Sequence, residues 1–194
     1  MNPSKSLPSL RKDIYGMIQY GDTTFDYTIY PNPHRKTEQE QNNLIKLFGN
    51  RIKNDVHCLD ITPDVVRNNI INKNYTALIY IKNTVTNDTA TCALQYWNWC
   101  DKKSQNKQLW INDLCRINKS DMANYNTISP VMALFESVEI FSKTYGITQN
   151  HIAVDNGTSS TTKLIDIYTR YKFFKDDKYS NDIQIVMKKY VDSR

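Results

Sequence analysis

The chain has 194 residues, of which 40% are hydrophobic and 23% charged, as in an ordinary soluble domain. No apolar run approaches the roughly 18 residues that a membrane helix needs, and no apolar stretch of a secretory signal follows the first basic residues. The composition argues against a membrane partner and predicts one domain in the cytoplasm.

Charge and cysteine spacing weigh against two kinds of binding site. The net charge of +5 is modest and much of it lies at the two ends of the chain, so nucleic-acid binding is only our third hypothesis. No C-x-x-C pair occurs and the three histidines are scattered, so we expect no metal site. Buried, reduced thiols are the preferred interpretation of the four cysteines, Cys58, Cys92, Cys100 and Cys115.

Residue usage points to an A/T-rich genome. Asn, Ile, Lys and Tyr, whose codons are rich in A and T, supply 72 of the 194 residues. Such a bias can also remove glycines and arginines that a family normally carries. The skew is compatible with a large DNA virus, and a viral protein would lie in the host cytoplasm or in the virion.

The first third of the chain predicts one strand and two helices. Residues 1–23 are polar and are interpreted as a tail or an edge extension. A strand is predicted over residues 24–30, where β-branched and aromatic residues alternate with polar ones. Thr37 and Glu40 form a capping box in front of a helix whose apolar face carries Leu44, Ile45, Phe48 and Ile52. Thr62, followed by a proline, predicts the start of a second helix.

The remaining elements predict a mixed sheet. Three strand-like runs separated only by polar turns predict antiparallel hairpins, at residues 75–82, 89–99 and 108–116. Ser129 and Pro130 then begin a helix that Gly146 ends. A strand, a helix and a last strand follow, near residues 151–155, 161–170 and 183–189. Because these last units need crossovers, parallel and antiparallel pairs must coexist.

The carboxyl-terminal third resembles the ending of the GNAT superfamily of acyl-CoA-dependent N-acyltransferases. That ending has Gly-Ile, a strand, a turn, and a helix closing in Leu-Tyr-x-x-x-Gly-Phe. Here Gly146-Ile147, Ile152-Ala153-Val154 and the segment from Leu164 to Phe173 match it in order and spacing. The segments 111–116 and 185–189 resemble the family's fourth and last strands, so the resemblance covers roughly residues 24–191.

The resemblance implies a fold, a domain plan and an activity. The expected fold is α/β (α+β), with a GNAT-like central mixed sheet of six or seven strands and helices on both faces. Residues 24–194 would form the acyltransferase domain, behind the tail or extension at 1–23. The expected activity is transfer of an acetyl group from acetyl-CoA to an unidentified amine by direct attack. A catalytically inactive GNAT-like fold, acting as a structural or interaction protein, is the alternative, and the oligomeric state is left open.

The coenzyme-phosphate loop departs from the family. The family carries Arg/Gln-x-x-Gly-x-Gly/Ala before its third helix, where glycines and amides approach the pyrophosphate. The matching residues 126–131 contain neither glycine nor arginine, and Pro130 removes one amide donor. Lys172 stands where the family has glycine, and Asn156 is out of register, whereas Thr161 holds the family asparagine's spacing. We therefore expect weak or absent acetyl-CoA binding.

Two residues are candidates for acid and base. The resemblance places Tyr168 at the position of the general acid that protonates the leaving thiolate, with a core aromatic as the alternative. Asp113 lies mid-strand among apolar residues, where desolvation in a cleft would raise a carboxyl pKa and suit a base. The alternative is that Asp113 faces solvent.

The other candidate site residues concern the coenzyme. In this family the fourth strand splays from the fifth, and the pantetheine arm runs between them. Backbone groups of Cys115, Arg116 and Ile117 would then contact that arm. The hydroxyls of Thr127 and Ser129, and the helix start at Val131, would hold the pyrophosphate, weakly without a cation. Thr161 is the last of the expected coenzyme-binding residues.

Overall fold

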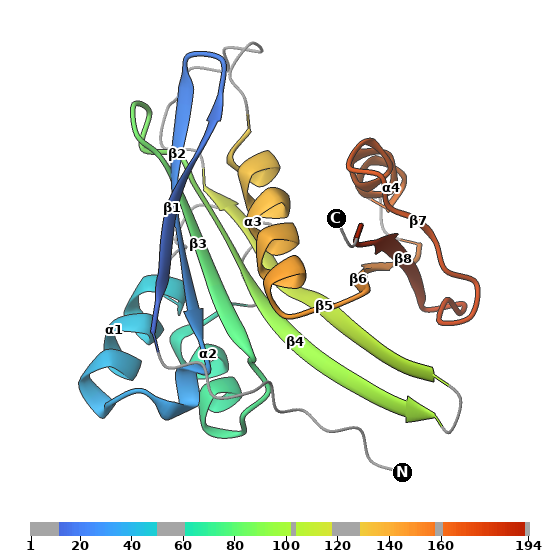
Figure 1. The fold of residues 1–194 in the computed structure, drawn as a ribbon, viewed down its shortest axis with the longest axis horizontal. Helices are drawn as coiled ribbons and strands as arrows, with labels where there is room; N and C mark the ends of the chain where they lie inside the picture. Colours follow the sequence, from blue (N-terminus) through green and yellow to red (C-terminus); the bar gives the residue numbers. More distant parts are fainter. Residues whose placement is uncertain (1–11, 50–60, 102–103, 118–128, 158–160, 193–194) are drawn as a thin grey trace.

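The computed structural model describes residues 12–49, 61–101, 104–117, 129–157 and 161–192 (Figure 1). Its sheet has eight strands in the order β1-β2-β3-β4-β5-β6-β8-β7. The strands are β1 (Ile14–Tyr20), β2 (Thr23–Pro31), β3 (Ala77–Asn83), β4 (Thr89–Asp101), β5 (Ser104–Ile117), β6 (Gln149–Asp155), β7 (Phe174–Lys175) and β8 (Gln184–Tyr190). Among these strands β5 and β6 pair in parallel and the other neighbours antiparallel, so the predicted mixed sheet is confirmed.

Side-chain caps define where the helices begin. The helices are α1 (Glu38–Gly49), α2 (Pro63–Ile71), α3 (Pro130–Thr144) and α4 (Thr161–Arg170), and a short 3-10 turn, η1 (Pro33–Arg35), precedes α1. The capping box before α1 is confirmed: the Thr37 amide donates to Glu40 Oε2 at 2.8 Å, and the Glu40 amide donates to Thr37 Oγ1 at 3.3 Å. Thr62 accepts from the Val65 amide at the start of α2.

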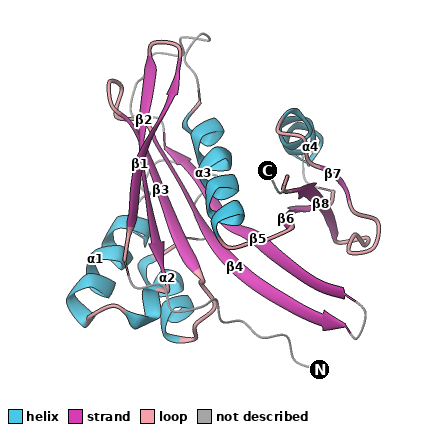
Figure 2. Cartoon of the chain, in the orientation of Figure 1, coloured by secondary structure: helices cyan, strands magenta, loops and turns pink. Residues whose placement is uncertain are grey.

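Helices cover both faces of the sheet, as expected (Figure 2). On one face α1 and α2 enclose a core with the middle strands, made of Leu44, Ile45, Phe48, Val66, Ile70, Tyr75, Leu78 and Ala93. On the other face α3 packs through residues such as Leu134 and Phe141, both fully buried. The Tyr168 ring of α4 lies 5.9 Å from the Phe135 ring of α3, so α4 shares the α3 face. Among the described residues no helix is both long and apolar enough to span a membrane.

The sheet is wider than the six or seven strands expected. The additional strand at one edge is β1, within the segment interpreted as a tail or extension, and it forms a hairpin with β2 through Gly21 at φ +55°. Its alternation leaves Tyr15 and Met17 largely exposed while Ile18 is buried. At the other edge, two-residue β7 pairs with β8. With only two residues, β7 is too short to show the alternation that predicts a strand.

A β-bulge interrupts the pairing of β4 with β5. Thr91 pairs with Cys115 but Ala93 pairs with Asn112, so β5 carries one extra residue opposite β4. Within the bulge Asp113 adopts a left-handed φ of 50°. The pairing of β5 with β6 ends at Ile111 and Ile152, although both strands continue. The strands therefore part just where Asp113 lies.

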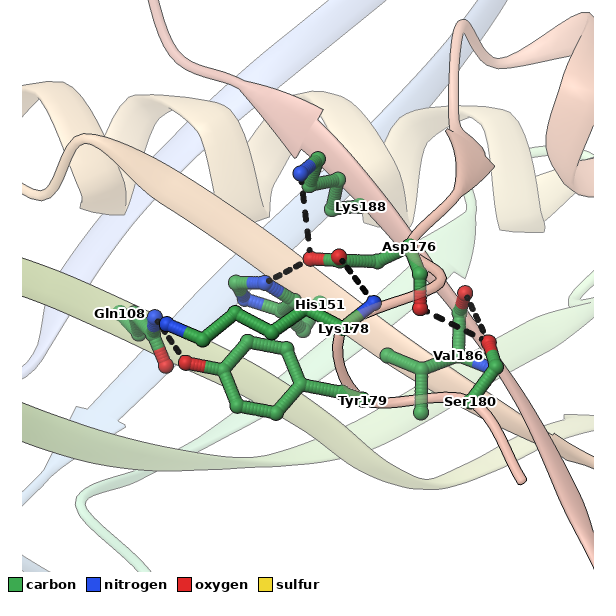
Figure 3. A network of polar contacts seen from close by, with 8 residues as sticks. All are labelled: Gln108, His151, Asp176, Lys178, Tyr179, Ser180, Val186 and Lys188. Atoms are coloured by element: carbon green, nitrogen blue, oxygen red, sulfur yellow. Dashed lines mark hydrogen bonds and ion pairs between the residues drawn. The ribbon is translucent and has the colours of Figure 1, made fainter.

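Where β5 and β6 still pair, a buried polar cluster fastens the β7–β8 connection to the sheet (Figure 3). His151 is 0% exposed; its ring stacks on Trp110 at 4.9 Å, and its Nε2 lies 3.4 Å from Asp176 Oδ2. Lys188 Nζ lies 3.3 Å from the same oxygen. Tyr179 packs edge-on against His151 and accepts a hydrogen bond from Gln108 Nε2 at 3.2 Å.

This cluster makes stability depend on pH. Burial lowers the pKa of His151 to about 4, and the Asp176 carboxylate offsets this only in part. Because the unfolded chain binds the proton near pH 6.5, stability is fully present above that pH and is lost as the pH falls toward 4. The loss at pH 4 should be roughly 3 kcal/mol, at about 1.4 kcal/mol per pKa unit.

Urea unfolding of the wild type and of His151→Gln between pH 4 and pH 7.5 measures this dependence. The difference between the two stability curves isolates His151 from the carboxyl groups, which titrate in both proteins. It should shrink as the pH falls from 6.5 to 4. A difference that stays constant with pH would mean that His151 takes up its proton as readily in the folded protein as in the unfolded chain.

Candidate functional site

A cavity of about 640 Å³ opens at the place where β5 and β6 part. From the α3/α4 side of the sheet it is lined by Ile111, Ile152, Val154, Leu164 and Tyr168, which belong to or pack against the core on that face. Leu114 of the bulge also packs against the core on that face. From the α2 side the cavity is lined by Asn69, Asn74, Tyr75, Gln95, Asn112, Asp113, Ala153, Asp155 and Gln184. Successive strand residues point to opposite faces, so the cavity joins the two faces through the sheet.

Tyr168 reaches the cavity from α4. The side chain is only 6% exposed and packs against the rings of Phe135 and Phe173. Burial raises the pKa of its phenol to about 12, so the hydroxyl stays protonated at neutral pH. Within the described part of the chain, no hydrogen bond of this hydroxyl is observed. Tyr168 can therefore donate a proton or a hydrogen bond to a group inside the cavity.

Asp113 reaches the cavity from the bulge and is held by neighbouring side chains. The Tyr75 hydroxyl donates to Asp113 Oδ2 at 2.5 Å, and Asn69 Nδ2 donates to the Tyr75 oxygen at 3.0 Å. Asn74 Nδ2 in turn donates to Asn69 Oδ1 at 2.9 Å. Burial, and then the Asp113 charge, raise the pKa of Tyr75 far above its usual value, so Tyr75 is a permanent donor. This hydrogen bond orients the Asp113 carboxylate through one of its two oxygens.

The start of α3 has little capacity left for an anion. The Val131 amide donates to Ser129 Oγ at 3.3 Å, and the Met132 amide donates to the Ser129 carbonyl at 2.9 Å. Pro130 has no amide hydrogen. The first amides of α3 are thus paired within the chain, unlike a helix start that is free to bind phosphate. Thr127 lies outside the described residues.

Two further predicted coenzyme residues, Cys115 and Thr161, do not line the cavity. Cys115 is buried and disulfide-bonded, so the expectation of a reduced thiol at this position is wrong, whereas Cys92 is free. The side chain of Ile117 lies outside the described part. Thr161 donates from its hydroxyl to the Asp155 carbonyl at 2.8 Å, which ties the start of α4 to the end of β6.

Arg116 is the one predicted coenzyme residue with an unsatisfied polar atom among those that the structure describes. It pairs with Ala90, which lies in the core beneath α3, so Arg116 points to that face. Its Nε is buried without a hydrogen-bond partner. Burial raises the pKa of Tyr171, and the charges of Arg116 and Arg170 partly oppose this rise. The Tyr171 ring lies 4.7 Å from that of Phe135 in α3.

The structure thus brings Asp113 and Tyr168 to one cavity, while Cys115, Arg116, Ser129, Val131 and Thr161 do not line it. Sequence reasoning missed Tyr75 and the carboxamides around it. In a chain so rich in asparagine no single amide is conspicuous, and the only available signal was a tyrosine at the start of a strand. Across the described ranges, no group of three or more His, Cys, Asp or Glu side chains could hold a metal ion.

Comparison with protein-family models and with curated proteins finds no match. Among solved structures, the chain is similar to a putative arylalkylamine N-acetyltransferase 7 of the yellow fever mosquito, with 11% identity, a TM-score of 0.51, and coverage of 99% of this chain and 100% of that one. The Escherichia coli ribosomal-protein-S18-alanine N-acetyltransferase gives 12% identity, a TM-score of 0.49, and coverage of 85% and 94%. An Elizabethkingia anophelis GNAT family acetyltransferase with acetyl-CoA bound gives 16% identity, a TM-score of 0.46, and coverage of 84% of this chain and 97% of that one. The chain has the fold of the GNAT acetyltransferases.

Proposed function

We propose that this protein is an acyl-CoA-dependent N-acyltransferase that transfers an acetyl group from acetyl-CoA to an amine by direct attack. The observation that carries the proposal is the cavity between β5 and β6, which Asp113 and Tyr168 both line. Asp113 belongs to the polar wall near α2, and Tyr168 reaches in from α4. A carboxylate and a neutral phenol at one cavity are a suitable base and acid for acyl transfer.

The proposed reaction needs no covalent intermediate with the protein. Asp113 accepts a proton from the acceptor ammonium, and the resulting amine forms a C–N bond to the thioester carbonyl carbon. Collapse of the tetrahedral adduct breaks the C–S bond, and Tyr168 donates its proton to the departing thiolate. The products are the amide and free coenzyme A. The phenolate, whose pKa of about 12 makes it strongly basic, recovers its proton from solvent or through Asp113.

We further propose that Arg116 supplies the cation that the phosphate loop lacks. Its side chain points to the face of the sheet that α3 covers, and its buried Nε has no partner among the described residues. A buried donor without a partner is costly, and a charge-assisted bond to phosphate would satisfy it. Backbone groups of Cys115 and Ile117, and the hydroxyls of Thr127 and Ser129, remain proposals for contacts to the rest of the coenzyme, as does Thr161.

The second candidate function is a GNAT-like fold without catalysis. The paired amides at the start of α3 favour it, because they weaken the phosphate site. Calorimetric titration with acetyl-CoA separates the two functions, since a scaffold would show neither binding nor release of coenzyme A. We also propose that the residue usage reflects a viral source and that the protein is cytoplasmic.

Replacement of Tyr168 by Phe tests the acid. The variant keeps the buried ring but removes the proton donor, so kcat should fall about 10²–10⁴-fold while acetyl-CoA affinity and melting temperature hardly change. Release of free thiol in the presence of an acceptor amine measures kcat. Tyr171→Phe is the matched control, because Tyr171 also packs on Phe135 but does not line the cavity. Equal turnover by wild type and Tyr168→Phe would refute the acid role.

Replacement of Arg116 by Gln tests the proposed phosphate contact. Acetyl-CoA should bind the wild type no more tightly than micromolar, and the variant about tenfold or more weakly, since a charge-assisted hydrogen bond contributes about 1.5–3 kcal/mol. S-acetylpantetheine, which lacks the phosphates, should bind both proteins equally. Arg170→Gln is the control, because burial raises the pKa of Tyr171 and the charge of this exposed arginine also partly opposes that rise. An equal fall in affinity for both ligands would show that Arg116 acts through packing instead.

A further inference from the structure

We propose that the acceptor is a polyhydroxylated cationic amine of the amino-sugar class, either a free monosaccharide or an aminoglycoside. The proposal rests on the proposed function and concerns the α2 side of the same cavity. That wall is built from five carboxamide side chains and two carboxylates, Asn69, Asn74, Gln95, Asn112, Gln184, Asp113 and Asp155. The described residues that line the cavity include no lysine, arginine or histidine.

The carboxamides can both donate to and accept from a ligand. A carboxamide offers two N–H donors and two acceptor lone pairs. Each of the five carboxamide side chains makes one or two hydrogen bonds within the wall. Examples are Asn112 Nδ2 to Gln95 Oε1 at 3.3 Å and Gln184 Nε2 to Asp155 Oδ1 at 3.4 Å. Several donors and acceptors therefore remain for a ligand. Hydroxyl groups, which donate and accept at once, match such a wall better than methylene groups do.

The two carboxylates lie at different depths. Asp113 is half-buried in the bulge, whereas Asp155 is exposed at the end of β6. In a protein with a net charge of +5, an anionic lining selects a cation locally. Asp113 would take the reacting amine, and Asp155 would attract the ligand at the rim or pair with a second ammonium. The negative charges of these two carboxylates would repel acidic peptides.

Size and wall polarity distinguish an amino sugar from other amines. A cavity of about 640 Å³ falls within the range of about 300–1,000 Å³ typical of small-molecule sites. A polyamine would satisfy the carboxylates but leave the carboxamides facing methylene groups. A site built to hydrogen-bond hydroxyls rejects analogues that lack them, because its own polar groups are then unpaired.

An acceptor panel with the full chain and acetyl-CoA tests the proposal. The panel contains glucosamine, kanamycin, spermidine, cyclohexylamine and a peptide that begins with alanine, and thiol release gives kcat/KM. The kcat/KM for glucosamine or kanamycin should exceed that for cyclohexylamine and spermidine. The expected ratio is about tenfold or more for each bonded hydroxyl group that the poorer acceptor lacks. The ratio of glucosamine to kanamycin separates a free sugar from an aminoglycoside. Preference for spermidine, cyclohexylamine or the peptide would overturn the amino-sugar class yet leave the N-acyltransferase proposal intact.

Binding without acetyl-CoA separates failure of this inference from failure of the proposed function. Calorimetry with kanamycin and glucosamine should show binding that Asp155→Asn and Gln95→Leu each weaken about tenfold, at unchanged melting temperature. Asp166→Asn, an exposed carboxylate of α4 outside the cavity, is the control and should bind normally. Such binding without thiol release from any acceptor would support the ligand class and reject catalysis. No binding of either sugar, or equal binding in all variants, would overturn the inference.

Discussion

The one residue that β5 inserts opposite β4 is the constraint on which the site depends. Thr91 pairs with Cys115 and Ala93 with Asn112, so the strand bends through Asp113 in a left-handed conformation. Beyond this point β5 no longer bonds to β6. A continuous ladder would have sealed the sheet, whereas the opening lets side chains from both faces line a single cavity.

The two sides of that opening differ in polarity. On the α4 side, aromatic packing keeps the Tyr168 phenol neutral. On the α2 side, a hydrogen bond from the Tyr75 hydroxyl holds the Asp113 carboxylate in place. Under the proposed function, the polar α2 side would receive the hydrophilic amine.

Packing elsewhere supports the opening from its closed end. His151 and Trp110 stack where β5 and β6 still pair, and Asp176 and Tyr179 clamp the β7–β8 connection over them (Figure 3). This buried cluster lies where the β5–β6 pairing is still intact, next to the point where the two strands part. By contrast, the start of α3 uses its first amides for its own cap.

The sequence by itself determined the helix starts at Thr37, Thr62 and Ser129 and the mixed order of strands, because caps and alternation act over a few residues. It also indicated the place of Tyr168, through a local motif. Only the tertiary structure decided the bulge at Asp113, the grouping of Asn69, Gln95 and Gln184 on one wall, and the buried Nε of Arg116. These features arise from contacts between residues far apart in the chain, and no local pattern of residues encodes such contacts.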